Sequence, residues 1–506
     1  METRKKEFEK KYGKRIKLFR SLLSVSDVPE KGEDFPLPVL DEKNKIPSSF
    51  FQDFKSMLNE KSFSDVEFRF KEHSQFLFLN EKEKKEEIVV FAHKCILAIR
   101  STIFDKIFNA IDKNDPNLNE ICKLIDCEVE VINKNGNLNE NENENENEKN
   151  PNLLNKKIQD NISKKYIFRI NLPFNLVFPI LEFIYSGRFN HNMLSNVEIV
   201  AKLRPIILSF EFENTVKLFD TIIEKYKFLN PEKKQENNSN NQENNQENNQ
   251  ENNQEKWIDM DEEKFNKKIK NLQNFEMEFA TNQFARLFSL SKYPDFLISI
   301  KEDEKNYKQV YGHKIILSKR CPYFEAQFRS GMKEMQANKV EFEEMRIEVF
   351  MMILSYIYSN RFIAPDVSLA IYEKNKKIHI ENNKIMLELI AISDYLGLER
   401  LKQLAENNLT KNIHPDLIIW SLVFSEQYNA QLLGDYCVWQ ISHNYEKFEN
   451  QKEFKEYLSK DQIQNLKKKR FPTKEYLKFS KKLKVKVANK FHLLNLNEKE
   501  DPKKKK

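Results

Sequence analysis

Two of the eight histidines of this 506-residue chain, His93 and His313, are the most obvious candidates for chemistry. Histidine binds metal ions and moves protons near neutral pH. Neither residue has His, Cys or carboxylate neighbours at ligand spacing, so we expect no metal site. No Ser/His/Asp or Cys/His arrangement recurs around them. The sequence therefore predicts no catalytic residue and no cofactor, and we expect a protein that is not an enzyme.

The two histidines occupy the same place in a repeated pattern. The stretch VFAHKCILAIRSTIFDKIF at 90–108 returns at 310–328 as VYGHKIILSKRCPYFEAQF, with a constant offset of 220 residues. A match over 19 residues without a gap indicates one structural unit present twice.

Composition narrows the class of protein. Lys and Arg number 84 against 78 Asp and Glu, a net charge of +6 that does not identify a nucleic-acid binder. The five cysteines form no CxxC pair, which favours a reducing compartment over a disulfide framework. No secretory signal and no membrane-length apolar run are present. We expect a cytoplasmic location, with the nucleus as an alternative.

Each copy predicts the same order of elements. Two alternating strands begin at SDVEFRF and EIVVFAHK in the first copy, and at PDFLISI and KQVYGHK in the second. Helices, a third strand and an amphipathic helix ending at YSGRF or YSNRF follow. Such a small sheet packed by helices is an α+β unit.

The first copy is longer than the second. His93 and Tyr185 are 92 positions apart, whereas His313 and Tyr358 are 45 apart, so the first copy carries 47 additional residues. The run NENENENEN lies in this interval, and repeats of ENNQ lie between the copies. Both have too little apolar surface to form a core, and we expect the insertion at about 111–164 and the repeats to be disordered.

The repeated motifs resemble the BTB/POZ domain. The resemblance rests on the SDV and PDF strand openings, the AHKCIL and GHKIIL steps, the helices RSTIFDKIF and RCPYFEAQF, and the endings ILEFIYSGRF and ILSYIYSNRF. Two such domains, the first with a long insertion, are similar to the C-terminal half of the RhoBTB family. The Rho GTPase domain of that family is not matched, because the residues before the first copy contain no GxxxxGK[ST] loop.

The resemblance implies two BTB/POZ domains and a helical extension similar to the three-box or BACK region. The expected segments are a charged N-terminal segment at 1–48, a first BTB/POZ domain at 49–229, a low-complexity linker at 230–256, a second BTB/POZ domain at 257–411, the helical extension at 412–480 and a basic tail at 481–506.

The resemblance also implies roles for particular residues. It assigns a structural signature to Asp65, His93, Tyr185, Asp295, His313 and Tyr358, in which the Asp and His residues stabilise the fold. In GMKEMQ, the residues Met332, Lys333 and Glu334 match a hydrophobic-x-Glu motif with which BTB adaptors dock on cullins. A polar loop that happens to contain Met is the alternative.

Dimerisation is the other property that the resemblance implies. Widely spaced apolar residues on a helix before the second copy suit burial against a partner helix, namely Phe275, Phe279, Phe284 and Phe288. They could instead pack on their own domain. The domains could form homodimers between chains, or the two copies could pair inside one chain.

The sequence thus favours an adaptor that recruits an unknown substrate protein to a cullin-3-type ubiquitin ligase. A BTB oligomerisation scaffold in signalling or cytoskeletal regulation, without cullin binding, is the alternative. A DNA-binding regulator is disfavoured, because no Cys/His finger or concentrated basic helix is present.

Overall fold

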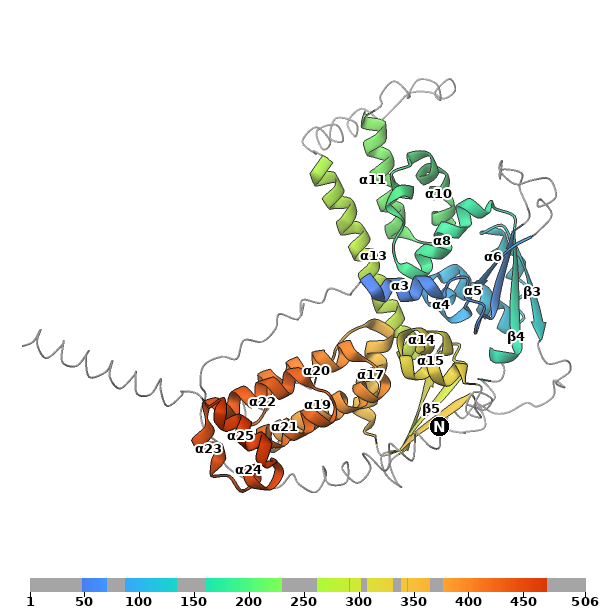
Figure 1. The fold of residues 1–506 in the computed structure, drawn as a ribbon. Helices are drawn as coiled ribbons and strands as arrows, with labels where there is room; N and C mark the ends of the chain where they lie inside the picture. The colour runs from blue at the N-terminus through green and yellow to red at the C-terminus, as the bar shows by residue number, and fades with distance from the viewer. Residues whose placement is uncertain are drawn as a thin grey trace, which may run out of the picture. The chain divides into compact units, whose positions relative to one another are not determined.

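The structure is a computed structural model that describes most of the chain between residues 48 and 470. The described ranges are 48–70, 87–133, 158, 161–229, 262–290, 292–301, 307–330, 338–343, 345–364 and 376–470. The chain divides into two compact units (Figure 1), one built mainly from residues 41–363 and one containing residues 364–394 and 399–506.

The first half of the larger unit contains a four-stranded sheet. Its strands are β1 (Val66–Phe70), β2 (Ile88–Ala92), β3 (Cys127–Asn133) and β4 (Lys164–Ile170), in the order β2-β1-β4-β3. β1 is antiparallel to β2 and parallel to β4, while β3 is antiparallel to β4. Val66, Phe68 and Phe70 alternate along β1 and are fully buried, as expected for a strand with one face on a core.

Helices cover that apolar face. Phe104 of α5 contacts the rings of Phe68 and Phe168 from two neighbouring strands, at centroid distances of 5.6 Å in both cases. The helices of this half are α3 (Ser48–Met57), α4 (Lys94–Arg100), α5 (Thr102–Asp112), α6 (Leu118–Lys123), α8 (Phe174–Ser186), α9 (His191–Leu194), α10 (Val197–Ser209) and α11 (Glu213–Leu229).

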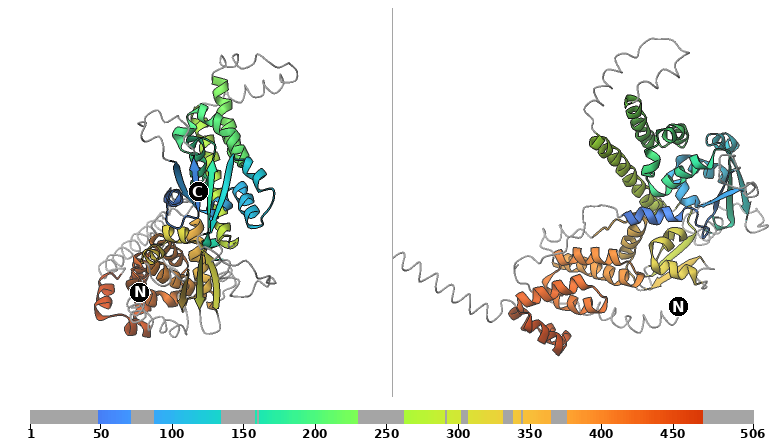
Figure 2. Two further views of the ribbon diagram at one scale, coloured as in Figure 1. Left: turned by 90° about the vertical axis from the view of Figure 1, so that its right-hand side faces the viewer. Right: turned by 45° about the horizontal axis from the view of Figure 1, so that its top comes forward.

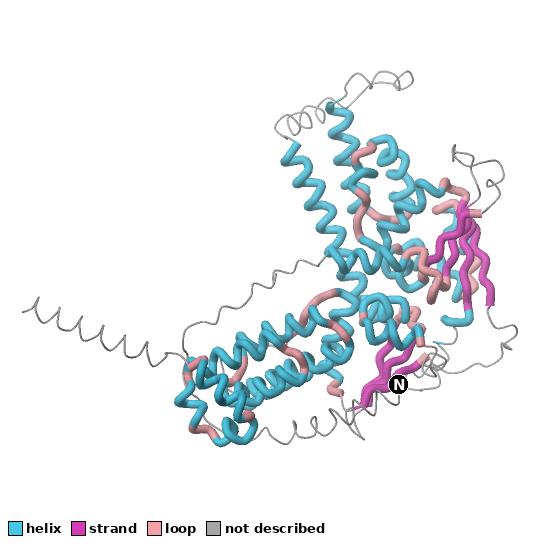
Figure 3. The backbone as a smooth tube through the Cα atoms, viewed as in Figure 1, coloured by secondary structure: helices cyan, strands magenta, loops and turns pink. Residues whose placement is uncertain are grey.

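The second half repeats this arrangement with three strands (Figure 3). They are β5 (Phe296–Lys301), β6 (Tyr307–Gly312) and β7 (Lys339–Glu343), in the order β6-β5-β7. β5 is antiparallel to β6 and parallel to β7, as β1 is to β2 and β4. The helices are α13 (Glu262–Leu290), α14 (Lys314–Arg320), α15 (Pro322–Arg329) and α17 (Ile347–Ser359). The α+β prediction and the three strands predicted in each copy are confirmed.

The helices α8 and α17 end where the repeated motifs predict. Gly187 and Asn360 follow them with φ of 69° and 56°, the left-handed conformation that ends many helices. Gly187 is also sterically required, because a Cβ there would lie 2.9 Å from Cβ of Ala280 in α13.

The prediction that the whole insertion at about 111–164 is disordered is wrong for its first part. Residues 118–123 form α6, and residues 127–133 form β3, which pairs along its full length with β4. The signal is visible in CEVEVIN, where apolar and polar residues alternate as in a strand, although only Cys127 is buried. The NENENENEN run and the ENNQ repeats lie outside the described residues.

The smaller unit is helical in its described part. The helices are α19 (Lys376–Leu396, whose last two residues belong to the larger unit), α20 (Glu399–Asn412), the 3-10 turn η3 (Pro415–Leu417), α21 (Ile418–Gln427), α22 (Gln431–His443), α23 (Tyr445–Glu449), α24 (Lys452–Tyr457) and α25 (Lys460–Lys468). The described part of the predicted extension at 412–480 is mainly helical, whereas α19 and nearly all of α20 fall in the stretch predicted as the second BTB/POZ domain. The basic tail lies outside the described residues. In the described ranges, no helix is both long and apolar enough to span a bilayer.

Candidate interaction surfaces

Asp65, His93 and Tyr185 meet where α4 begins in the first half. The backbone N–H of Lys94 donates to Oδ1 of Asp65 at 2.7 Å, which satisfies a free donor of the first helical turn. The backbone N–H of His93 donates to the hydroxyl of Tyr185 at 2.8 Å, and Nδ1 of the ring lies 3.0 Å from the same oxygen. The cluster thereby joins the residue before β1, the start of α4 and the end of α8.

Asp295, His313 and Tyr358 repeat this cluster in the second half. The N–H of Lys314 donates to Oδ1 of Asp295 at 2.8 Å, and the N–H of His313 donates to the hydroxyl of Tyr358 at 2.9 Å. Nδ1 of His313 lies 2.8 Å from that hydroxyl.

Both histidines are buried, and burial lowers the pKa of His93 and of His313 to about 4. The structure thus brings the six residues of the predicted signature together in two equivalent hydrogen-bonded clusters. No group of three or more possible metal ligands occurs in the described part of the chain.

The first helix of each half crosses to the other half. Helix α3 packs against α8 of its own half and against α14 of the second half. Helix α13 packs against α17 of its own half and against α4 and α11 of the first half; the start of α13 and α11 lie side by side (Figure 2), with Nζ of Lys225 3.7 Å from the centroid of the Phe265 ring. The exchange of α3 and α13 is reciprocal, so the same elements contribute from both sides, as in an isologous dimer.

Phe54 and Phe284 lie at the centre of this crossing. Their rings stack with centroids 3.9 Å apart, and both side chains are fully buried. Phe288 lies against Tyr358, 5.6 Å between centroids. In contrast, Phe275 and Phe279 are 54% and 43% exposed. The helix that was predicted to meet a partner helix thus buries Phe284 against α3 of its own chain.

Two equivalent arginines form hydrogen bonds to the crossing helices. Nε of Arg100 donates to the carbonyl oxygen of Ile184 at 2.9 Å, and its Nη1 donates to the side chain of Gln283 on α13. Arg320 repeats this 220 residues later.

Arg320 completes the second crossing. Its Nε donates to the carbonyl oxygen of Ile357 at 3.2 Å, and its Nη1 pairs with Asp53 on α3. Arg100 and Arg320 match in the repeat, but no role was predicted for them. Their recurrence at the same register was the available signal.

The turns that lead into β1 and β5 also reach across. Phe63 contacts Phe328 of α15 with centroids 5.7 Å apart, and Tyr293 contacts Phe108 of α5 with centroids 6.1 Å apart. Phe63 and Tyr293 both have positive φ, of 61° and 52°. An aromatic residue rarely adopts this conformation, so the surrounding contacts must hold it there.

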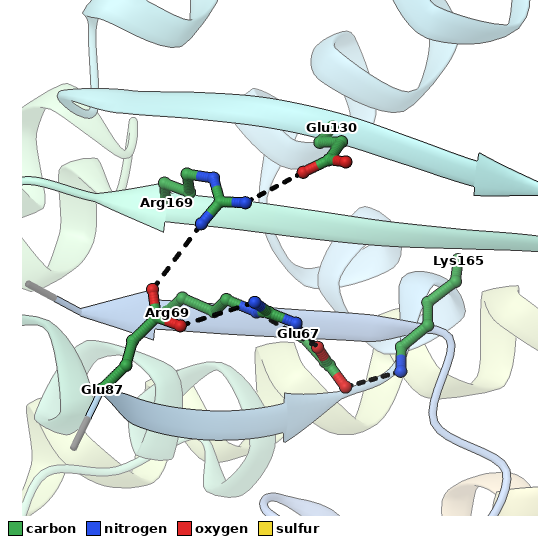
Figure 4. A network of polar contacts seen from close by, with 6 residues as sticks. All are labelled: Glu67, Arg69, Glu87, Glu130, Lys165 and Arg169. Atoms are coloured by element: carbon green, nitrogen blue, oxygen red, sulfur yellow. Dashed lines mark hydrogen bonds and ion pairs between the residues drawn. The ribbon is translucent and has the colours of Figure 1, made fainter.

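The outer face of the first sheet carries an ion-pair network (Figure 4). Arg169 of β4 binds Glu130 of β3 at 3.0 Å, and Arg69 of β1 binds Glu67 at 2.9 Å. The members alternate in sign across three strands and the residue before β2: Glu67, Arg69, Glu87, Glu130, Lys165 and Arg169. This face is therefore charged but balanced.

The predicted cullin-docking residues cannot be placed. Met332, Lys333 and Glu334 lie in 331–337, outside the described residues, directly before β7.

Comparison with known proteins identifies a domain that begins in the second half. The sequence model of the BTB/POZ domain matches residues 284–413, so the chain contains a BTB/POZ domain there, a module that generally mediates protein interactions. A BTB/POZ domain-containing protein of Arabidopsis thaliana is 20% identical over 208 residues, which are 40% of this chain and 76% of the relative.

Two mouse relatives match shorter stretches. TD and POZ domain-containing protein 2 of Mus musculus is 26% identical over 125 residues, 25% of this chain and 30% of the relative. TD and POZ domain-containing protein 3 of the same organism is 25% identical over 176 residues, 35% of this chain and 42% of the relative. The chain thus spans less than half of either mouse protein.

Proposed function

From the BTB/POZ domain at residues 284–413, we propose that this chain is a non-enzymatic adaptor with two BTB/POZ-type modules, which pair with each other inside one chain. We further propose that it recruits a substrate protein to a cullin-3-type ubiquitin ligase, with a pair of modules similar to that of the RhoBTB family.

The duplicated Asp–His–Tyr cluster supports a BTB/POZ-type module in the first half. The same three side chains join equivalent elements in both halves, with N–H to carboxylate distances of 2.7 and 2.8 Å. The strand pairing is equivalent as well. The reciprocal crossing of α3 and α13 is the single observation that carries intramolecular pairing.

The adaptor role rests on the resemblance of Met332, Lys333 and Glu334 to the docking motif, and on the place of this motif between α15 and β7. A flexible Met side chain can fill a shallow apolar pocket, and a carboxylate can pair at its rim. An adaptor needs no catalytic group, because it acts by raising the effective concentration of its substrate near the ligase.

The test is binding of the full chain to a cullin-3 N-terminal domain, measured by calorimetry. We expect the wild type to bind, and Met332→Asp and Glu334→Lys each to weaken binding by about tenfold or more. Glu278→Lys makes the same charge change at an exposed position on α13 and should bind like the wild type. A wild-type chain that does not bind the cullin domain contradicts the adaptor role.

The second candidate is an oligomerisation scaffold without cullin binding. The observation that favours it is the exposure of Phe275 and Phe279 one turn apart on α13. A scaffold would keep its partners when Glu334 is replaced by Lys and lose them when both phenylalanines are replaced by Ser.

A further inference from the structure

The two sheets differ at one edge. In the first half, β3 pairs with the outer edge of β4 as a fourth strand. In the second half, β7 is the counterpart of β4, since each is parallel to the first strand of its half. Among the described residues β7 pairs with β5 alone and forms the edge of its sheet. The chain itself therefore shows how a strand docks on this edge in the first half, while in the second half no described residue pairs with it.

The open edge presents backbone groups for pairing. The N–H of Leu297 donates to the carbonyl oxygen of Asn338 at 2.9 Å, so residue 338 directs its backbone toward β5. The N–H and C=O groups of successive residues in a strand point to opposite sides. Those of Lys339, Glu341 and Glu343 therefore point away from β5. Unpaired outward groups on an edge are a template for an added strand.

The charge at this edge is reversed between the halves. In register, β1 Arg69 lies opposite β4 Arg169, and its counterpart Ser299 lies opposite Glu341. In the first half the docked strand β3 places Glu128 opposite Arg169 and binds Arg169 through Glu130. In the first half, acidic residues of the added strand thus lie next to the basic Arg169. In the second half, the equivalent position of the edge strand is the acidic Glu341.

The apolar side of the edge strand is also defined. Val340 and Phe342 are 5% and 7% exposed, while Glu341 and Glu343 are exposed on the other face. A docked strand would continue both faces, with apolar residues on the core side and polar residues on the outer side.

We propose that the edge of β7 binds an extended segment of a partner protein as an antiparallel fourth strand, with Lys or Arg opposite Glu341 and apolar residues at alternate positions. A second copy of β7 fits less well, because antiparallel pairing of KVEFE with itself sets Glu341 opposite Glu341. The proposal does not depend on cullin binding, which involves other residues.

The first test is the charge preference of the full chain for two labelled nine-residue peptides, one alternating Lys with Val and one alternating Glu with Val. Fluorescence anisotropy should show at least about tenfold tighter binding of the Lys peptide to the wild type. The net charge of +6 would favour the opposite order through nonspecific attraction. Glu341→Lys should reverse the preference, and Glu278→Lys should leave it unchanged.

The second test locates the peptide. Glu341→Pro removes an outward N–H without touching a β5 hydrogen bond, so the sheet should persist while binding of the Lys peptide is lost. Hydrogen exchange should slow at 339, 341 and 343 of the wild type when the peptide is bound. Equal binding by Glu341→Pro and wild type, protection at another strand, or self-association of the wild type that Glu341→Pro abolishes would each overturn the proposal. Should Glu341→Pro fail to fold, an unchanged preference in Glu341→Lys would do so.

Discussion

The hydroxyl oxygen of Tyr358 is a hydrogen-bond partner of two groups of His313 in the second half. It accepts the N–H of His313 at 2.9 Å and lies 2.8 Å from the ring Nδ1. Tyr358→Phe leaves a buried donor without its acceptor, so we expect the free energy of unfolding to fall by about 1–3 kcal/mol. Urea unfolding monitored by circular dichroism measures the change.

The control for this prediction is Tyr445→Phe. The hydroxyl of Tyr445 is buried and has no hydrogen-bond partner among the described residues, so its removal should change stability by less than about 0.5 kcal/mol. Equal effects of the two variants would show that the cluster does not stabilise the fold.

The buried histidines predict a pH dependence of stability. Burial lowers the pKa of His93 and His313 to about 4, whereas an unfolded histidine titrates near 6.5. Between these values the unfolded chain binds protons that the folded chain does not, so stability is fully present above about pH 6.5 and falls as the pH drops to about 4. The loss is on the order of 3 kcal/mol per histidine.

The measurement is the free energy of unfolding from pH 7 to pH 4.5. His313→Gln should remove about half of the slope that the two histidines produce. A slope that is the same in the variant and the wild type would mean that His313 is protonated in the folded chain.

At the scale of elements, the crossing of α3 and α13 depends on Phe284. It is fully buried and stacks on Phe54, whereas Phe275 of the same helix is 54% exposed. Phe284→Ala should lower the free energy of unfolding by about 3–5 kcal/mol through lost burial and a cavity. Phe275→Ala is the matched control and should change it by less than about 0.5 kcal/mol. Similar losses of unfolding free energy in both variants would show that the crossing does not depend on Phe284.

The same elements show what the sequence could predict. The strands and the helix ends at Gly187 and Asn360 follow from local pattern and repetition, and the structure has them. The Asp–His–Tyr residues followed instead from the resemblance to the BTB/POZ domain. The pattern of phenylalanines on α13 also indicated burial. This pattern could not show that α3 of the same chain covers Phe284. The spacing of apolar residues indicates that a face of a helix is buried, but it does not identify the segment that buries it.

The strand β3 was missed for a different reason. Its alternation in CEVEVIN is readable, but the second copy has no equivalent, and a Glu- and Asn-rich run follows closely. Comparison between the copies therefore assigned the whole interval to disorder. β3 is an edge strand with one buried residue, so its formation depends on pairing with β4. The residues that it pairs with are more than 30 positions away along the chain.

At the scale of the whole molecule, the crossing determines how many chains assemble. An isologous interface closes once both of its sides are filled. Here α3 fills the side offered by α14, and α13 fills the side offered by α4, within one chain. The surface that would join two chains in a homodimer is thus already occupied, and the full chain should behave as a monomer of 60.6 kDa in light scattering.

The same closure sets the stoichiometry of the proposed cullin complex. Because one motif containing Glu334 is present per closed pair, a complex with the cullin-3 N-terminal domain should contain one copy of each protein. Analytical ultracentrifugation over a hundredfold range of concentration separates this from a two-to-two assembly. A mass that rises with concentration in the wild type, and that Phe275→Ser with Phe279→Ser returns to the monomer value, would show that the exposed part of α13 joins chains. The intramolecular pairing would then be only one of two interfaces.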